Sequence, residues 1–334
     1  MANENTFRVK PSKSLARQVS RQDDAIIEAT WAYYHDGLNQ SEIAARLGVS
    51  RASVVNYLTE ARRREYVRIT LNSDVFLSHE LSEKLREAYG LDEVLVVPSD
   101  PTGQAGSTDR VARATADWLP QLLRPGDRLG VAWGETVYRV AEMAPHLSVN
   151  DVTVVQLVGS RAAGLGYAAE VCTATIARHF GASVVNLHVP LILSSAALAA
   201  QLRAEPDIAG QLQAVEDCNK VLFACGTVND ASHIARTRIL SRESLAAYRA
   251  QGATGVICSR LIDARGAPVP TEIDDRLIGV TLEQMRNKEM GLLVASGPDR
   301  VAGARASMLG GYVTHFATCS DTAQLLLDFT GADR

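Results

Sequence analysis

The spacing of apolar residues changes partway along this 334-residue chain. Over residues 22–61 the apolar positions recur every three or four residues, which is the period of amphipathic helices. From about residue 91, short apolar runs alternate with segments of helical spacing. The change predicts a small helical domain followed by a larger α/β domain.

Residues 40–61, QSEIAARLGVSRASVVNYLTEA, have the pattern of a helix-turn-helix. Asn39 and Glu42 are spaced as a capping box at the start of the first helix. Gly48 stands where that helix must end, and Ser50 is placed to cap the second helix. Because caps, glycine and apolar spacing agree, we expect the second helix to enter the major groove of DNA.

The second helix has one apolar face, on which Val54 and Leu58 lie four residues apart. The opposite face is expected to contact base edges through Arg51, Ser53, Asn56 and Tyr57. The arginines that follow are expected to contact phosphates: Arg62, Arg63 and Arg64. A β-like run at 66–69 then suggests a winged variant. An amphipathic helix over 22–37 precedes the unit, with Ile26, Ile27, Ala29, Trp31 (or Tyr33) and Tyr34 on its apolar side.

Apolar runs in the remainder predict buried strands at 93–98, 128–133, 152–158, 183–189, 220–225, 276–280 and 291–296. Helices are expected between them at 109–123, 135–144, 167–180, 206–217, 281–287, 299–309 and 320–329. This alternation predicts a doubly wound, mostly parallel α/β sheet covered on both faces. The expected domains are a flexible N-terminal segment (1–21), a DNA-binding domain (22–72), a linker helix (73–90) and an effector domain (91–330).

Charge is distributed unevenly between the two parts. The net charge is −4, but residues 1–70 hold eleven Lys/Arg against eight Asp/Glu, a net of +3, and the rest carries −7. Only the basic part is expected to meet phosphate, and its modest excess implies several copies, as in a homodimer or homotetramer. The sequence has no long apolar run and no apolar leader at its start. We therefore expect a cytoplasmic protein that makes no contact with a membrane. The scattered cysteines and histidines predict no disulfide framework and no metal site.

Small and polar residues follow several predicted strands at one edge of the sheet. They are Trp133, Gly134, Glu135, Thr136, Gly159, Ser160, Arg161, Pro190, Ser194, Cys225, Gly226 and Thr227. Each glycine alone is ordinary turn chemistry, but the set is expected to line one ligand site, since carboxyl ends of parallel strands share an edge. The G-x-G-x-x-A run at 164–169 lies beyond the strand end and lacks an acidic partner. No nucleotide cofactor is therefore expected.

The chain resembles the SorC family of bacterial sugar-binding transcriptional regulators, also called DeoR-type. The resemblance spans residues 22–329 and includes LNQSEIAARLGVSRASV, GVAWGET and the closing LLVASGPDRVAGARASMLGGYVTHFATCSDTAQLLL. It implies a helix-turn-helix joined to an effector domain of the sugar-phosphate isomerase and CoA-transferase type. It also implies an oligomer that binds a palindromic double-stranded DNA operator near carbohydrate genes, with binding altered by a sugar, polyol or sugar phosphate.

By position, the resemblance assigns effector contacts to Gly134, Glu135, Thr136, Gln156, Gly159, Ser160, Gly226 and Thr227. Arg300 replaces a common lysine and is expected to be the nearest fixed cation. Val256 and Cys319 replace acids, which together with Glu135 favours a free polyol or sugar slightly over a phosphorylated one. The expectation is a regulator and not an enzyme. The alternatives are an isomerase-like enzyme and a constitutive DNA-binding protein with a non-functional pocket.

Overall fold

The computed structural model describes residues 21–69, 72–77, 79–161, 167–230 and 232–332. The expected flexible N-terminal segment and the first part of the G-x-G-x-x-A run lie outside these residues. The contacts divide the chain into two compact units, Met1–Thr70 and Leu71–Arg334. Among the described residues, no helix is long and apolar enough to span a membrane.

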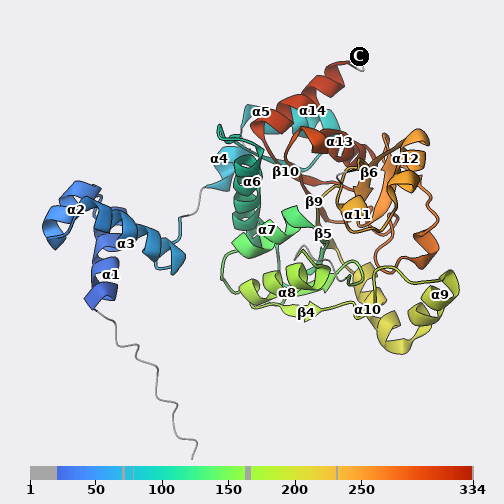
Figure 1. Cartoon of the computed structure of the whole chain (residues 1–334), viewed down its shortest axis with the longest axis horizontal. Coiled ribbons are helices and arrows are strands. Elements are labelled where there is room, and N and C mark those ends of the chain that lie inside the picture. Colours follow the sequence, from blue (N-terminus) through green and yellow to red (C-terminus); the bar gives the residue numbers. More distant parts are fainter. Residues whose placement is uncertain (1–20, 70–71, 78, 162–166, 231, 333–334) are drawn as a thin grey trace, which may run out of the picture. The chain divides into compact units, whose positions relative to one another are not determined.

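The first unit is a bundle of three helices around a small apolar core (Figure 1). Its helices are α1 (Arg21–Tyr34), α2 (Gln40–Leu47) and α3 (Arg51–Arg63). The core includes Ala29, Ile43, Val54 and Leu58, as the spacing predicted for all four. Ile26 is also buried, as expected, but the expected burial of Ile27 and of Trp31 (or Tyr33) is wrong, because α1 turns these side chains outward and buries Ala32.

The predicted wing is also wrong. Residues 66–69 form no strand, and the Tyr66 amide donates to the Ala61 carbonyl, which ends α3. Tyr66 and Ile69 are exposed. An alternating apolar run becomes a strand only where another strand pairs with it, and here none does.

The predicted linker helix is two helices, α4 (Ser73–Leu77) and α5 (Glu80–Tyr89). The Nδ1 atom of His79 accepts from the Leu81 amide and so caps a new helix start. Leu85 is fully buried in the same apolar cluster as Val94 of β1 (Glu93–Val97) and Leu326 of α14 (Ser320–Ala332). The segment is therefore part of the second unit's core.

The second unit is built on a parallel sheet, in which the described residues form seven strands in the order β1-β10-β9-β5-β2-β3-β4. Six of the predicted strands are confirmed, each shorter than predicted, but the strand at Ser183–Val185 is exposed at the edge of the sheet and not buried as expected. The strands are β1 (Glu93–Val97), β2 (Arg128–Val131), β3 (Thr153–Gln156), β4 (Ser183–Val185), β5 (Lys220–Phe223), β9 (Met290–Val294) and β10 (His315–Cys319). The predicted strand at 276–280 is wrong, since Leu277 and Gly279 make only isolated bridges.

Helices cover both faces of this sheet, as predicted (Figure 1). Leu95 and Val97 of β1 face one apolar cluster with α6, α7 and α8, whereas Val94 and Val96 face the other with α5, α10, α12, α13 and α14. The bounds are α6 (Gln104–Trp118), α7 (Glu135–Met143), α8 (Ala169–Phe180), α9 (Ala196–Ala204), α10 (Pro206–Glu216), α11 (His233–Arg236), α12 (Arg242–Ala250), α13 (Val301–Leu309) and α14 (Ser320–Ala332). The predicted helix at 281–287 is a series of turns.

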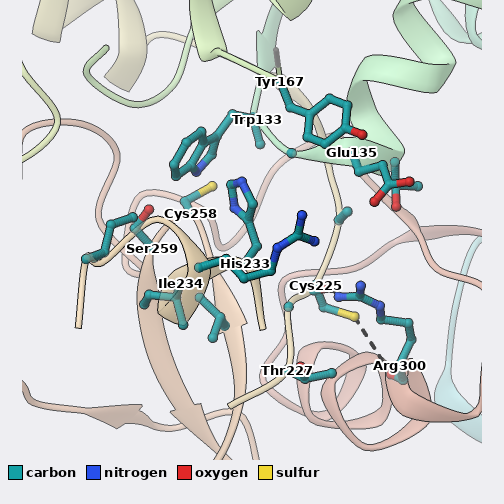
Figure 2. Close-up of a pocket in the computed structure, with 18 residues that line it drawn as sticks. Trp133, Glu135, Tyr167, Cys225, Thr227, His233, Ile234, Cys258, Ser259 and Arg300 are labelled. Atoms are coloured by element: carbon teal, nitrogen blue, oxygen red, sulfur yellow. Dashed lines mark hydrogen bonds between the residues drawn. The ribbon is translucent and has the colours of Figure 1, made fainter. Parts of the chain in front are cut away.

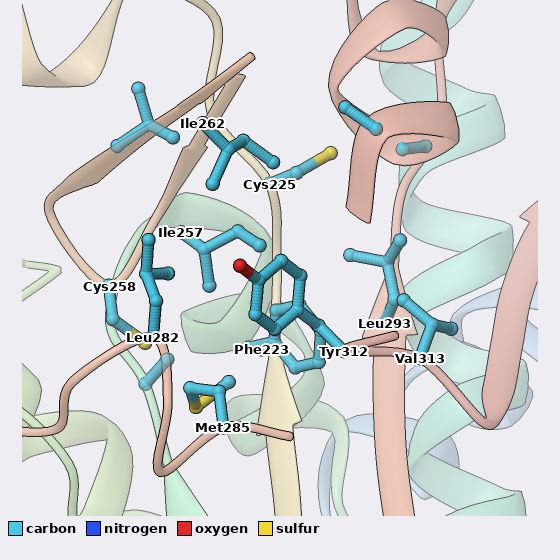
Figure 3. Close-up of a cluster of buried hydrophobic side chains, with 14 of the residues drawn as sticks. Phe223, Cys225, Ile257, Cys258, Ile262, Leu282, Met285, Leu293, Tyr312 and Val313 are labelled. Carbon is cyan, nitrogen blue, oxygen red and sulfur yellow. The ribbon is translucent and has the colours of Figure 1, made fainter. Parts of the chain in front are cut away.

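A small antiparallel sheet, which the apolar pattern did not predict, packs beside the large one. It consists of β6 (Ala253–Ile257), β7 (Arg260–Asp263) and β8 (Pro268–Val269). Figure 3 shows Ile257 and Ile262 pointing into the cluster that contains Phe223 and Cys225. Gly226 and Val256 exchange two backbone hydrogen bonds, which fix the small sheet against the end of β5.

Candidate functional site

The helix-turn-helix has the local geometry that its sequence predicted. Asn39 Oδ1 accepts from the Glu42 amide at 3.1 Å, and Glu42 Oε2 accepts from the Asn39 amide at 2.7 Å, which completes the capping box. Gly48 has φ +65°, and Ser50 Oγ accepts from the Ser53 amide at 3.1 Å. These contacts fix the angle between α2 and α3, which any entry of α3 into a groove requires.

The residues expected to meet bases differ in how freely they are presented. Asn56 and Arg51 are exposed, and Arg51 Nε donates to Gln40 Oε1 at 3.3 Å. Ser53 Oγ lies 2.9 Å from Ser50 Oγ, within the cap. Tyr57 is half-buried against the core. Their contacts with bases stay a prediction, for which Asn56 is the most freely presented side chain.

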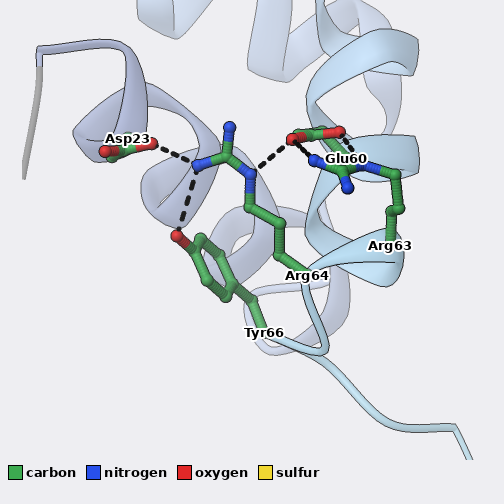
Figure 4. A network of polar contacts seen from close by, with 5 residues as sticks. All are labelled: Asp23, Glu60, Arg63, Arg64 and Tyr66. Atoms are coloured by element: carbon green, nitrogen blue, oxygen red, sulfur yellow. Dashed lines mark hydrogen bonds and ion pairs between the residues drawn. The ribbon is translucent and has the colours of Figure 1, made fainter.

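The three arginines expected to meet phosphates are largely engaged within the unit, and Figure 4 shows the contacts of Arg63 and Arg64. Glu60 accepts from Arg63 at 2.6 Å and also pairs with Arg64, and Arg64 pairs with Asp23 at 2.5 Å. Hydrogen bonds from Arg63 and Arg64 lower the pKa of Glu60 to about 2. Arg62 Nε donates to the Leu58 carbonyl at 3.4 Å. Contact with phosphate would therefore have to compete with Glu60.

In the second unit, a cavity opens at the carboxyl ends of β2 and β5 (Figure 2). Six of the predicted effector residues line it: Gly134, Glu135, Thr136, Gly226, Thr227 and Arg300. Gly134 begins α7 with φ +118° and no side chain caps this helix start. The first amides of α7 are thus available to an oxygen-rich ligand.

The other predicted residues lie outside the lining of this cavity. Gln156 is fully buried, and its Nε2 donates to the Val158 carbonyl at 2.8 Å and to Ser160 Oγ at 3.2 Å. At Gly159, an added Cβ would lie 2.7 Å from the Leu191 backbone. These residues support the loop after β3. Cys319 also lies elsewhere, with its Sγ 3.3 Å from both Ser296 Oγ and Thr322 Oγ.

The charged groups of the lining are mostly basic. Glu135 is its one carboxylate among the described residues, and it pairs with Arg139 at 2.8 Å on its own helix. Arg236 and Arg300 also line the cavity. Arg300 is held in place, since its Nη1 donates to the Cys225 carbonyl at 3.0 Å and its Nε lies 3.2 Å from Asp299.

Trp133 was expected in this site, but much of the remaining wall comes from segments to which the sequence analysis assigned no effector contact. Trp133 and His233 pack edge to face with ring centroids 4.6 Å apart. Burial, followed by the charges of Arg236 and Arg300, lowers the pKa of His233. The other lining residues missed are Tyr167, Ile234, Arg236, Ile239, Cys258 and Ser259. No local pattern marks them, because the cavity forms only when α11 and the turn between β6 and β7 meet the large sheet.

Comparison with known proteins gives matches over nearly the whole chain. The family model described as "Putative sugar-binding domain" matches residues 73–328. The "Uncharacterized transcriptional regulator YjhU" of Escherichia coli K12 is 36% identical over 310 residues, which is 91% of this chain and 94% of that protein. The deoxyribonucleoside regulator of Bacillus subtilis 168 is 32% identical over 304 residues, 90% of this chain and 96% of that protein.

The fold has solved counterparts. The full-length sorbitol operon regulator SorC of Klebsiella pneumoniae superimposes with a TM-score of 0.75 at 24% sequence identity. The match covers 92% of this chain and 99% of that structure. At this identity the likeness concerns the fold, and it extends across both units.

Proposed function

Because the chain belongs to the SorC/DeoR-type family of sugar-binding transcriptional regulators, we propose that a phosphorylated sugar or polyol bound in the cavity at α7 alters its binding to an operator. The observation that carries this proposal is the uncapped start of α7 beside two arginines. Backbone amides at a helix start and guanidinium groups are the usual partners of a phosphate. The role proposed is binding and not catalysis.

The phosphorylated form is proposed in place of the free form for a structural reason. The expectation of a free sugar depended on Glu135 and on the acids missing at Val256 and Cys319. Glu135 pairs with Arg139, which also pairs with Asp109, and Cys319 lies outside the cavity. Arg236 and Arg300 line the cavity as cations, which supports an anionic group there, and the remaining hydroxyls would face the rest of the wall.

The test is thermal unfolding and calorimetric titration of the full chain with named pairs of ligands. The pairs are ribose, glucose, fructose and sorbitol, each with its terminal phosphate. A phosphate bound through charged hydrogen bonds should bind roughly 10- to 100-fold more tightly than the free form. Ligand that binds the folded state raises the unfolding temperature. A free sugar that binds as tightly as its phosphate would overturn the anionic part of the proposal.

The same site can be tested through DNA. An operator selected from a randomised duplex library would be titrated with and without the ligand found above. Thr136→Val and Arg300→Met should each raise the ligand concentration needed to change operator binding, about tenfold or more for Arg300. An unchanged ligand response in both variants would place the effector elsewhere.

Two copies of the chain are proposed to bind the operator together. A net charge of +3 per first unit is small for tight binding by one copy at physiological salt. Two-fold assemblies bind half-sites spaced by whole turns, about 34–36 Å each. Light scattering at micromolar concentration should give a dimer or tetramer, and tight operator binding by a strict monomer would refute this.

A further inference from the structure

The turn that joins β6 to β7 is strained. Cys258 and Ser259 have φ values of +48° and +70°. This left-handed region is costly for residues with a Cβ, and glycine or asparagine is usual in such a two-residue hairpin turn. Nothing in the turn itself requires a serine at the second position. When the surrounding structure holds a residue in an unfavourable backbone conformation, a role for its side chain is suggested.

The Ser259 hydroxyl is buried and has no partner among the described residues. Ser259 is 5% exposed, and its Oγ makes no hydrogen bond there. The residue lines the same cavity as Gly134 and Arg300. A buried hydroxyl without a hydrogen bond is destabilising, so a ligand that supplied one would gain affinity from it.

A second polar atom of the same wall, His233 Nε2, is also buried without a hydrogen-bond partner among the described residues. The ring is held by its edge-to-face contact with Trp133. In Figure 2, His233 lies between Ser259 and Glu135. The two orphaned polar atoms thus belong to the part of the wall that is contributed by α11 and the β6–β7 turn.

We infer that Ser259 Oγ and His233 Nε2 hold the hydroxyl-bearing end of the effector, and that Ser259 determines which hydroxyl pattern is accepted. This rests on the proposed function, in which the anionic end of the ligand lies at α7. A sugar hydroxyl both donates and accepts, so it can satisfy a serine hydroxyl and either tautomer of a neutral imidazole. A site that hydrogen-bonds a ligand hydroxyl discriminates against the analogue that lacks it.

The experiment distinguishes the effect of losing the Ser259 hydroxyl from the effect of relieving the backbone strain at Ser259. Ser259→Gly removes both the hydroxyl and the strain, whereas Ser259→Ala removes the hydroxyl and keeps the strain. Asp151→Gly is the matched control, since Asp151 has φ +53° in an exposed turn and does not line the cavity. Each full-length variant is unfolded thermally without ligand, and then titrated with the sugar phosphates of the panel above.

Ser259→Gly is expected to raise the unfolding temperature by about 2 °C and to weaken the best-bound sugar phosphate roughly 3- to 10-fold. Ser259→Ala should weaken binding equally with a smaller gain in stability, because it removes the unpartnered hydroxyl but keeps the backbone strain. Asp151→Gly should leave the affinity unchanged. His233→Phe, which keeps an aromatic ring against Trp133, should also weaken binding.

The ligands provide a second test. Ribose 5-phosphate and 2-deoxyribose 5-phosphate differ by one hydroxyl, as do glucose 6-phosphate and 2-deoxyglucose 6-phosphate. For the pair that binds, the preference of the wild-type protein for one member should shrink in Ser259→Gly. Wild-type affinity and preference in Ser259→Gly would refute the inference and leave the proposed function standing. A panel in which no member binds the wild-type protein would overturn the proposed function, and this inference with it.

Discussion

We expect Glu60 to limit how strongly the first unit binds DNA. It is hydrogen-bonded to Arg63 and Arg64, two of the side chains expected to meet phosphates. Glu60→Gln removes its charge but keeps a hydrogen-bonding group of the same shape. Among the described residues, Glu60 is the one carboxylate that pairs with Arg63, so Arg63 loses its ionic partner. Arg64 keeps its pair with Asp23. The substitution should therefore release about one cation per unit.

The size of the effect follows from counterion release. Each phosphate contact steepens the plot of log affinity against log salt by about 0.9, which corresponds to roughly fivefold in affinity near 0.15 M salt. Glu60→Gln should show one such increment per unit. Glu60→Gln combined with Asp23→Asn should show about two. Because this term is independent of sequence, any fixed duplex serves as the probe, and fluorescence anisotropy between 50 and 300 mM salt measures it.

A control variant distinguishes the effect of releasing an arginine from the effect of changing the net charge. Asp24→Asn on α1 changes the charge by the same amount, and Asp24 is exposed there. Its salt slope should stay at the wild-type value. With its pKa at about 2, Glu60 is ionised throughout the assay range, and its stabilising pairs are lost only as the pH falls toward that value. An unchanged slope in Glu60→Gln would mean that Arg63 does not meet phosphate.

Three further predictions follow from buried or strained groups. Lys220 Nζ lies 2.7 Å from Asp127 Oδ2, and both side chains are under 10% exposed. Lys220→Met should therefore lower the free energy of unfolding in urea by about 3–5 kcal/mol, and adding Asp127→Asn should recover part of that loss. No recovery would contradict an ion-pair origin of the loss. Burial raises the pKa of Asp127, but hydrogen bonds from Lys220 and Asn219 outweigh it and lower the pKa, so the pair stabilises above pH about 4 and this stability is lost as the pH falls further. The difference in unfolding midpoint between wild type and the double variant should shrink between pH 5 and 3, and a constant difference would refute this. Gly48 has φ +65°, so Gly48→Ala should lower the free energy of unfolding by about 1 kcal/mol and weaken DNA binding. The affinity for the sugar phosphate, measured by calorimetry, should stay unchanged. DNA binding at the wild-type level would contradict this prediction.

The sequence was most informative where a structure depends on neighbouring residues. The capping box at Asn39, the left-handed Gly48 and the Ser50 cap are each set by contacts within three or four positions, and all three are confirmed. The buried strands were predictable because both faces of the sheet are covered, which requires continuous apolar runs. Five strands follow that rule, whereas β4 is an exposed edge strand.

The errors occur where distant residues decide the outcome. Leu277 and Ile278 are fully buried, yet their segment is a loop, so an apolar run alone does not make a strand. The His315–Cys319 strand has a mixed composition and exists because β1 and β9 pair with it on both sides. His233 and Ser259 lie in segments without any local pattern, and only the tertiary structure brings them to one cavity.

The pairing of β1 with β10 joins the beginning and the end of the second unit, since Glu93 is in register with His315. During synthesis on the ribosome, this sheet stays incomplete until the last strand has emerged. The core of the first unit, by contrast, is formed by residues that precede position 70. A chain terminated early would thus retain the DNA-binding module and lose the sensor. Nonsense mutations late in the coding sequence should accordingly give proteins that no longer respond to the proposed effector, rather than a simple absence of the regulator.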